Sequence, residues 1–147
     1  LPFISLTRFF IVTLQPVLCT NINNDQQDTY KGASGFIGSF IVEEALNRDM
    51  EVWAAVRKTT SRKYLQDKRI HFIELDFSSK EQLKAQLSEH EFDYIVHAAG
   101  VTKCLDKADF RRMNTEGTKN FVDALIELQM PLKRFVFLSS LSVFGAI

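Results

Sequence analysis

The sequence has no excess charge of either sign and few cysteines. Its 18 basic and 18 acidic side chains cancel, whereas nucleic acid and acidic lipid are captured largely by excess Lys and Arg. The composition therefore argues against nucleic acid or a membrane surface as a partner. The two cysteines, Cys19 and Cys104, lie far apart and form no CxxC or metal-ligand spacing. This predicts a reducing compartment, taken as the cytoplasm, and no metal site.

Long hydrophobic runs are also missing. The first twenty residues are apolar, but Arg8, Gln15 and Pro16 interrupt them, and a bilayer span needs about 20 apolar residues. The run 9–14 is short for a signal peptide and no small-x-small cleavage site follows it, so we predict neither kind of segment. With 46% hydrophobic residues in 147, the chain is typical of one soluble globular domain or a piece of one.

From residue 32 onward, short apolar runs alternate with helical patterns. Four runs are typical of strands buried on both faces of a parallel sheet: Glu51–Val56, Ile70–Leu75, Tyr94–Ala98 and Arg134–Leu138. Helical spacing predicts helices over Phe36–Arg48, Lys80–Leu87 and about Phe110–Gln129. Such alternation predicts right-handed crossovers and an α/β fold with a Rossmann-type doubly wound parallel sheet that stops after its fifth strand.

A glycine-rich turn opens the first of these helices. In GASGFIG, Gly32 allows a sharp turn, Gly35 lets the backbone approach a pyrophosphate, and Gly38 lets the helix pack closely on the sheet. The helix N-terminus then faces the anion. The predicted cofactor contacts of this turn are Gly32, Ser34, Gly35, Phe36, Ile37 and Gly38.

A buried strand is expected directly before this turn, but the polar stretch before Gly32 is unsuited to a strand. Further upstream, Arg8–Thr13 (RFFIVT) has the composition of a buried strand. Either this segment fills the central slot and 18 residues bulge out, or residues 1–31 are aberrant sequence. We favour the second alternative, because long structureless loops are uncommon in compact domains. We still expect 9–13 to be the segment best able to pair beside 52–56, and we assign residues 32–147 to a partial NAD(P)-binding domain.

Five stretches in one order resemble the extended short-chain dehydrogenase/reductases, the NAD-dependent epimerase/dehydratase family. They are GASGFIGS, LDFS at 75–78, VHAAGV at 96–101, MNTEGTKN at 113–120 and FLSSLSVFG at 137–145. The resemblance covers the chain from residue 32 to its end. It implies a nicotinamide dinucleotide cofactor, but it does not identify a substrate.

The resemblance implies further cofactor contacts at the ends of two strands. Asp76 and Phe77 resemble the pair that contacts adenine, and the alternative for Asp76 is a strand-end cap. The strand end that passes beside the ribose is matched by four residues: His97, Ala98, Ala99 and Gly100. We expect the His97 side chain itself to be structural rather than an acid or a base.

The resemblance also implies catalytic residues. Ser140 matches the Ser or Thr that bonds a substrate oxygen, and Asn114 matches the helix Asn that holds a water or a backbone carbonyl near the active site; the alternative for Asn114 is a solvated helix residue. Phe144 stands where the family usually has Tyr. The family's Tyr and Lys, four residues apart, follow the Ser and are absent here, so we expect no turnover by these 147 residues. Tyr64 and Lys68 have that spacing but precede Ser140, and we interpret them as ordinary helix neighbours.

Arg57 bears on the choice of cofactor. Where NAD users place an acidic residue after the second strand, this chain has Arg57 followed by Lys58. Arg suits a 2′-phosphate through bidentate, charge-assisted bonds, which favours NADP over NAD. The alternative is a solvated loop.

The sequence thus predicts the cofactor-binding portion of a nucleotide-sugar epimerase, dehydratase or related reductase. Its partners would be the dinucleotide, a small-molecule substrate in the intact protein and a second copy packed along 110–129, although the apolar positions of that helix could equally be core. Two other hypotheses remain open: a non-catalytic NAD(P)-sensing or scaffold protein on the same fold, and an inert fragment of a disrupted gene.

Overall fold

Five parallel strands form one sheet in the order β3-β2-β1-β4-β5. The computed structural model describes residues 8–12, 36–56, 62, 64–101 and 106–140. The strands are β1 (Arg8–Val12), β2 (Glu51–Val56), β3 (His71–Glu74), β4 (Tyr94–His97) and β5 (Arg134–Phe137). This is the predicted doubly wound α/β fold, with all four predicted downstream strands confirmed to within one residue at each end.

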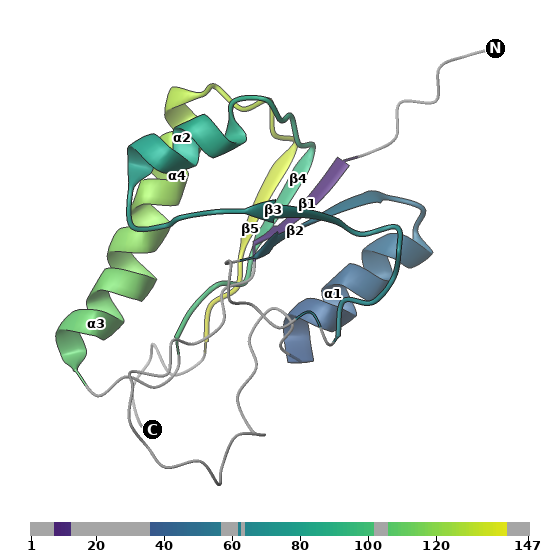
Figure 1. Cartoon of the computed structure of the whole chain (residues 1–147), viewed down its shortest axis with the longest axis horizontal. Helices are drawn as coiled ribbons and strands as arrows, with labels where there is room; N and C mark the ends of the chain where they lie inside the picture. The colour runs from purple at the N-terminus through teal and green to yellow at the C-terminus, as the bar shows by residue number, and fades with distance from the viewer. Residues whose placement is uncertain (1–7, 13–35, 57–61, 63, 102–105, 141–147) are drawn as a thin grey trace, which may run out of the picture.

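The helices cover both faces of the sheet. They are α1 (Phe36–Asn47), α2 (Lys80–Leu87), α3 (Lys107–Arg111), the π-helical turn η1 (Arg112–Glu116) and α4 (Gly117–Glu127). Figure 1 shows α1 on one face, and α2, α3 and α4 on the other. We call these the α1 face and the α4 face.

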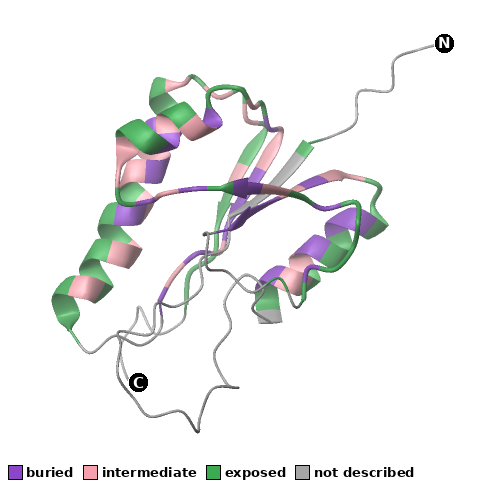
Figure 2. Ribbon diagram, in the orientation of Figure 1, coloured by how far each residue is buried: buried purple, intermediate pink, exposed green. Residues whose placement is uncertain are grey.

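Each face has its own apolar core, seen as purple segments on the inner sides of the helices in Figure 2. Side chains alternate along β2, so that Val52 and Ala54 pack under α1 while Ala55 belongs to the α4 face. On the α4 face, Leu83 and Phe121 are fully buried. The α4 core is the larger of the two and extends under β3, β4 and the residues that follow them.

The central strand comes from residues that the sequence leaves in doubt. Residues 8–12 pair in parallel register with 51–55 on one side, and 9–12 pair with 94–97 on the other. The expected pairing beside 52–56 is confirmed, and the central slot is filled as the first of the two alternatives states. The origin of residues 1–31 stays a prediction.

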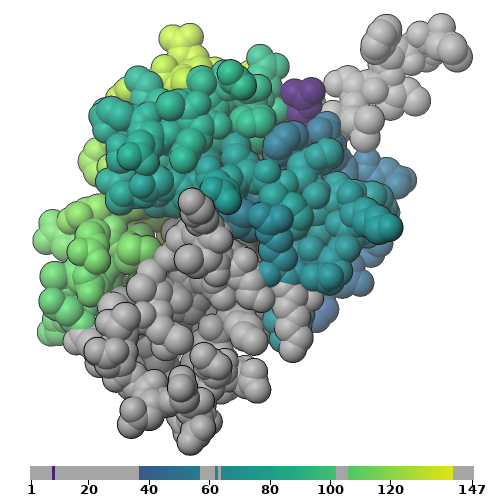
Figure 3. Space-filling view, in the orientation of Figure 1, coloured from purple at the N-terminus to yellow at the C-terminus, as the bar shows by residue number. Residues whose placement is uncertain are grey.

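The edge of the sheet where the strands begin, here the amino edge, is fastened through Asp93. Its carboxylate accepts a hydrogen bond from the Arg8 backbone N–H at 2.9 Å and pairs with Lys133 Nζ at 2.7 Å. Its backbone N–H donates to the Arg8 carbonyl at 3.0 Å. The Lys133 ammonium, and then the Arg8 N–H, hold the pKa of Asp93 below its usual range. One residue therefore ties together the starts of β1, β4 and β5, and Figure 3 shows the start of β1, in purple, at this surface.

Two helix predictions need correction. Residues 64–68 form a turn and irregular chain rather than a helix, because Asp67 accepts hydrogen bonds from the backbone and guanidinium of Arg69 and so stabilises a local turn. The long helix predicted over 110–129 begins earlier, at Lys107, and changes to π geometry within η1. Asp106 caps this start by accepting from the Ala108 N–H at 2.9 Å.

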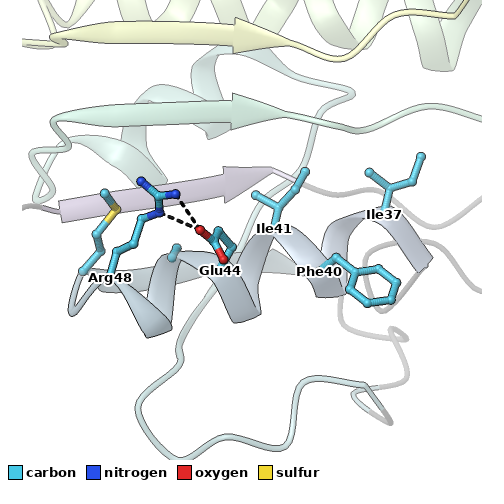
Figure 4. A pocket seen from close by; sticks show the side chains of 7 residues that line it. Ile37, Phe40, Ile41, Glu44 and Arg48 are labelled. Carbon is cyan, nitrogen blue, oxygen red and sulfur yellow. Dashed lines mark hydrogen bonds and ion pairs between the residues drawn. The ribbon is translucent and has the colours of Figure 1, made fainter.

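One flank of α1 carries an apolar groove of about 490 Å³. Ile37 and Phe40, each 56% exposed, line it at the start of the helix, and Arg48 and Glu44 close it at the other end with an ion pair of 2.6 Å (Figure 4). Figure 4 also shows that α1 runs against the direction of β1, so that Ile37, at the start of the helix, lies beyond the arrowhead of β1.

Candidate functional site

The candidate site lies at the carboxyl edge of the sheet, the edge where all five parallel strands end. The strand order reverses at β1, because β2 and β3 lie on one side of it while β4 and β5 lie on the other. Sheets of this type bind ligands in the crevice at such a reversal. The start of α1 reaches the same edge (Figure 4), and the free N–H groups of a first helical turn favour an anion there.

The glycine turn is described only in part. Gly32, Ser34 and Gly35 lie outside the described residues, as do Arg57 and Lys58. Gly38 is buried within the first turn of α1, which is the environment that close helix packing requires. Of the other two residues predicted from this turn, Phe36 begins α1 and Ile37 is largely exposed.

The end of β3 presents a carboxylate to the site. Asp76 Oδ1 accepts from the Ser78 hydroxyl at 2.6 Å and from the Ser78 backbone N–H at 2.9 Å. These two bonds hold the pKa of Asp76 below its usual value, so the group is an anion and a hydrogen-bond acceptor at neutral pH. The turn corresponds to the capping alternative and leaves Asp76 partly accessible.

Phe77 is a core residue in this structure. Its ring is 7% exposed and packs 5.3 Å from the Phe121 ring, and the Phe77 carbonyl accepts from Asn120 Nδ2 at 3.1 Å. The ring is therefore turned into the α4 core.

His97 ends β4 and is 1% exposed. Its Nε2 shares a hydrogen bond of 2.9 Å with Thr118 Oγ1 on α4, and Nδ1 has no partner among the described residues. Burial lowers the pKa of His97 to about 4, so the imidazole is neutral at pH 7. A buried neutral ring in this position agrees with the structural role expected from the sequence.

The chain after β4 is held by Asn114. The Asn114 side chain accepts from the Val101 N–H at 2.7 Å and donates to the Val101 carbonyl at 2.9 Å. Gly100 lies directly beneath this amide, since a Cβ there would come 3.4 Å from Asn114 Oδ1. The expected bond from Asn114 to a backbone carbonyl is present, and Asn114 is half-buried rather than solvated.

Ser140 follows the end of β5 at the same edge. It is exposed, and the ladder that leads to it continues past β5, because the Leu138 N–H donates to the His97 carbonyl at 2.9 Å. The structure thus brings the ends of β3, β4 and β5, with Asp76, Gly100 and Ser140, to one edge. Residues 143–145, which place Ser140 in the family's pattern, lie outside the described residues.

Sequence reasoning missed Thr118 and Asn120. Both belong to the stretch MNTEGTKN, and both reach residues predicted for the site, His97 and Phe77. The available signal was spacing: Thr118 lies four residues after Asn114, and residues four apart share one face of a helix.

The described part of the site fits a dinucleotide. A helix N-terminus and a strand end of small residues from 98 to 100 lie at the reversal of strand order, and a carboxylate follows β3 at the same edge of the sheet. This is the arrangement that holds the pyrophosphate and ribose groups of such cofactors. Among the described residues, no three His, Cys, Asp or Glu side chains are grouped to hold a metal ion. Within the same residues, no helix is long and apolar enough to cross a bilayer.

The fold is a Rossmann-type, doubly wound α/β architecture. The sequence model of the NAD-dependent epimerase/dehydratase family matches residues 31–147, which is most of the chain, and this protein belongs to that family. The match begins after β1.

The chain is also similar to named relatives and to solved structures. The chain is 26% identical over 131 residues to a UDP-glucose 4-epimerase of Drosophila melanogaster, covering 78% of this chain and 37% of that protein. The UDP-Glc/GlcNAc 4-epimerase of Campylobacter jejuni superimposes with a TM-score of 0.71 at 20% identity, over 95% of this chain and 39% of that one. WbmH of Bordetella bronchiseptica, solved with NAD+, has a TM-score of 0.69 at 23% identity, over 97% and 42%. The chain therefore spans about two fifths of the length of these relatives.

Proposed function

We propose that these 147 residues are the dinucleotide-binding portion of an extended short-chain dehydrogenase/reductase that acts on a nucleotide sugar by hydride transfer. The observation that carries this proposal is the meeting of the α1 start, Asp76, the strand end 98–100 and Ser140 at one sheet edge. The family and the nucleotide-sugar epimerases among its relatives support it. When bound, the nicotinamide would accept or return the hydride.

Each described residue has a role in this proposal. The first turn of α1 faces the pyrophosphate, and Asp76 accepts a hydrogen bond from the adenosine part. The small residues 98–100 let the ribose approach the backbone. Ser140 donates to a substrate oxygen, and Asn114 keeps Val101, and with it the strand end, in place.

Turnover is not expected from these residues alone. The three tyrosines, Tyr30, Tyr64 and Tyr94, all precede Ser140, so the proton-transferring Tyr and Lys of the family have no counterpart after it. A phenol whose pKa is lowered by a nearby ammonium is what moves the proton in such a reaction. NADP(H)- or NAD(H)-dependent turnover of a nucleotide sugar by the purified chain would contradict this part.

Cofactor titration tests the proposal directly. A ligand that binds only the folded state raises stability, by about 2.7 kcal/mol at a hundred times its Kd. We expect NAD+, NADH, NADP+ or NADPH to raise the Tm, with ADP-ribose giving a smaller rise and free nicotinamide none. The Asp76→Asn variant, with Asp67→Asn as a matched control, should weaken this rise. No shift with any dinucleotide at millimolar concentration would reject the proposal.

The same titration ranks NADP against NAD. Arg57 directly follows β2, at the strand end where a 2′-phosphate or a 2′-hydroxyl would be contacted. We propose that NADP is preferred and that Arg57→Ala removes the preference. WbmH was solved with NAD+, so tighter binding of NAD than of NADP by the unmodified chain is the outcome that would reverse this choice.

A further inference from the structure

The partly buried hydrogen bond between His97 and Thr118 has no role in the proposal so far. His97 ends β4 and Thr118 is the second residue of α4, and their Nε2 and Oγ1 atoms lie 2.9 Å apart. Four aromatic rings surround the imidazole, with centroids 5.5 to 6.2 Å away: Phe77, Phe121, Phe135 and Phe137.

Packing alone does not account for an imidazole in this cage. His97 is 1% exposed, and its Nδ1 is buried without a partner among the described residues. An unpaired polar atom in such a place costs free energy, whereas an apolar side chain of similar size would carry no such cost. What the imidazole adds over an apolar side chain of similar size is therefore its hydrogen bond to Thr118.

Among the described residues, that bond is one of two attachments between the segment 97–101 and the helix segment beside it. His97 meets Thr118 at one end of the segment, and Val101 meets Asn114 through two hydrogen bonds at the other. The two attachments are four positions apart on each segment, from 97 to 101 on one and from 114 to 118 on the other. Ala98, Ala99 and Gly100 lie between them, and these are the small residues at the candidate crevice.

We propose that His97 and Thr118 are positioning residues that fix the backbone of 98–100 for the dinucleotide. This inference rests on the proposed function, which assigns 98–100 to the cofactor. The His97 imidazole does not reach the ligand, since it lies in the α4 core. Their bond instead holds one end of the crevice wall while Asn114 holds the other.

His97 also contacts the end of β5 and Leu138, which lies two residues before Ser140. The Phe137 ring lies 5.5 Å from the imidazole, and the His97 carbonyl accepts from the Leu138 N–H at 2.9 Å. The same residue therefore sets the spacing between the cofactor side of the crevice, after β4, and the substrate side, after β5.

Two Thr118 variants separate positioning from stability. Thr118→Val keeps the shape but removes the hydroxyl, whereas Thr118→Ser keeps the hydroxyl and removes a methyl group. Dissociation constants for NADH and NADPH are measured by fluorescence, and amide hydrogen exchange is followed at 98–101. We expect Thr118→Val to weaken binding and speed exchange about fivefold to tenfold, the ratio that follows from losing one net hydrogen bond. Thr118→Ser should stay within about twofold of the unmodified chain.

The double variant His97→Leu/Thr118→Val tests whether weaker cofactor binding is merely the result of lower stability. Replacing both polar partners by apolar groups of similar shape is close to neutral for stability, so its Tm should equal or exceed that of the unmodified chain while its cofactor binding remains weakened. A purely structural role predicts instead that binding follows Tm.

The outcomes distinguish this inference from the function on which it rests. If Thr118→Val and Thr118→Ser bind and exchange alike, the positioning role is overturned and the proposed function stands. If the unmodified chain binds no dinucleotide, the proposed function falls together with the cofactor part of this inference. The exchange rates at 98–101 then decide by themselves whether the pair holds the segment.

Discussion

The two edges of the sheet are held by different kinds of bond. At the amino edge, a charged carboxylate does most of the fastening, because Asp93 joins Arg8 and Lys133 at a partly exposed position. At the carboxyl edge, neutral side chains attach the loops to α4 and η1, with Asn114 on Val101, Thr118 on His97 and Asn120 on Phe77. These three attachments add no charge to the carboxyl edge, where Asp76 is the carboxylate already present.

The largest expected difference between the edges comes from Asn114. Asn114→Ala leaves both the N–H and the carbonyl of Val101 unpaired at a residue that is 3% exposed, so we expect the free energy of unfolding to fall by about 2–4 kcal/mol. Urea denaturation measures this. Thr115→Ala, at an exposed neighbour in η1, is the matched control and should change stability by less than about 0.5 kcal/mol. Equal effects of the two variants would contradict the attachment of the carboxyl edge.

Acid should act on the carboxyl edge first. The folded pKa of His97 is about 4 against an ordinary 6.5, so the unfolded chain binds the proton more readily. Its stabilising contribution is complete above pH 6.5 and is lost as the pH falls toward 4, by up to about 3 kcal/mol. Urea midpoints measured between pH 7 and 4 should show this slope in the unmodified chain and a shallower slope in His97→Leu. His71→Leu, at an exposed histidine, serves as the control, and an unchanged slope in His97→Leu would refute the prediction.

The amino edge should respond at lower pH and to a smaller extent. The pKa of Asp93 is lowered by Lys133 and Arg8, so its contribution is present above an ordinary carboxyl pKa and is lost as the pH falls through the lowered value. We expect Asp93→Asn to cost about 1 kcal/mol at pH 7 and to remove this acid step below about pH 4. Glu91→Gln, at an exposed neighbour, is the control. A loss at pH 7 as large as that of Asn114→Ala would erase the contrast between the two edges.

The smallest effect is expected away from both edges. Glu127 on α4 pairs with Lys80 and Lys84 on α2, each at 2.6 Å, and these bonds lower its pKa to about 2. The groups are exposed, so solvent and salt screen the pairs. Glu127→Gln should lower the Tm by less than Asp93→Asn, and the difference from the unmodified chain should vanish at 1 M salt. A salt-independent loss would show that the carboxylate acts through packing.

Periodicity predicted the fold well because its signals are local. The runs 51–56 and 134–138 and the helix 80–87 appear where apolar spacing places them. The bounds of the long helix were missed because its Asp106 cap lies upstream of the apolar pattern, and 64–68 was misassigned because the turn at Asp67 competes with a helix. For β1 the signals opposed each other: the long polar separation favoured aberrant sequence over 1–31, whereas the strand-like composition of 9–13 predicted the pairing that the structure has.

The candidate site was predicted in outline by residue type and order. Strand ends in a parallel sheet must share an edge, so Asp76, Gly100 and Ser140 could be grouped from the sequence. The direction in which each side chain points at that edge could not be predicted from the sequence. Whether Phe77 and His97 point into the crevice or into the α4 core depends on the packing of rings from four separate elements, and no local spacing encodes it.

The position of β1 also governs how the chain assembles. Arg8 and Asp93, which meet at the start of β1, are 85 residues apart in the sequence, so the centre of the sheet belongs to its earliest-made segment. At synthesis rates of roughly 5–20 residues per second, the partner strand β4 follows on the order of 4–17 s later. During that interval β1 can pair only with β2, so its other side stays open and is exposed to aggregation until β4 is made.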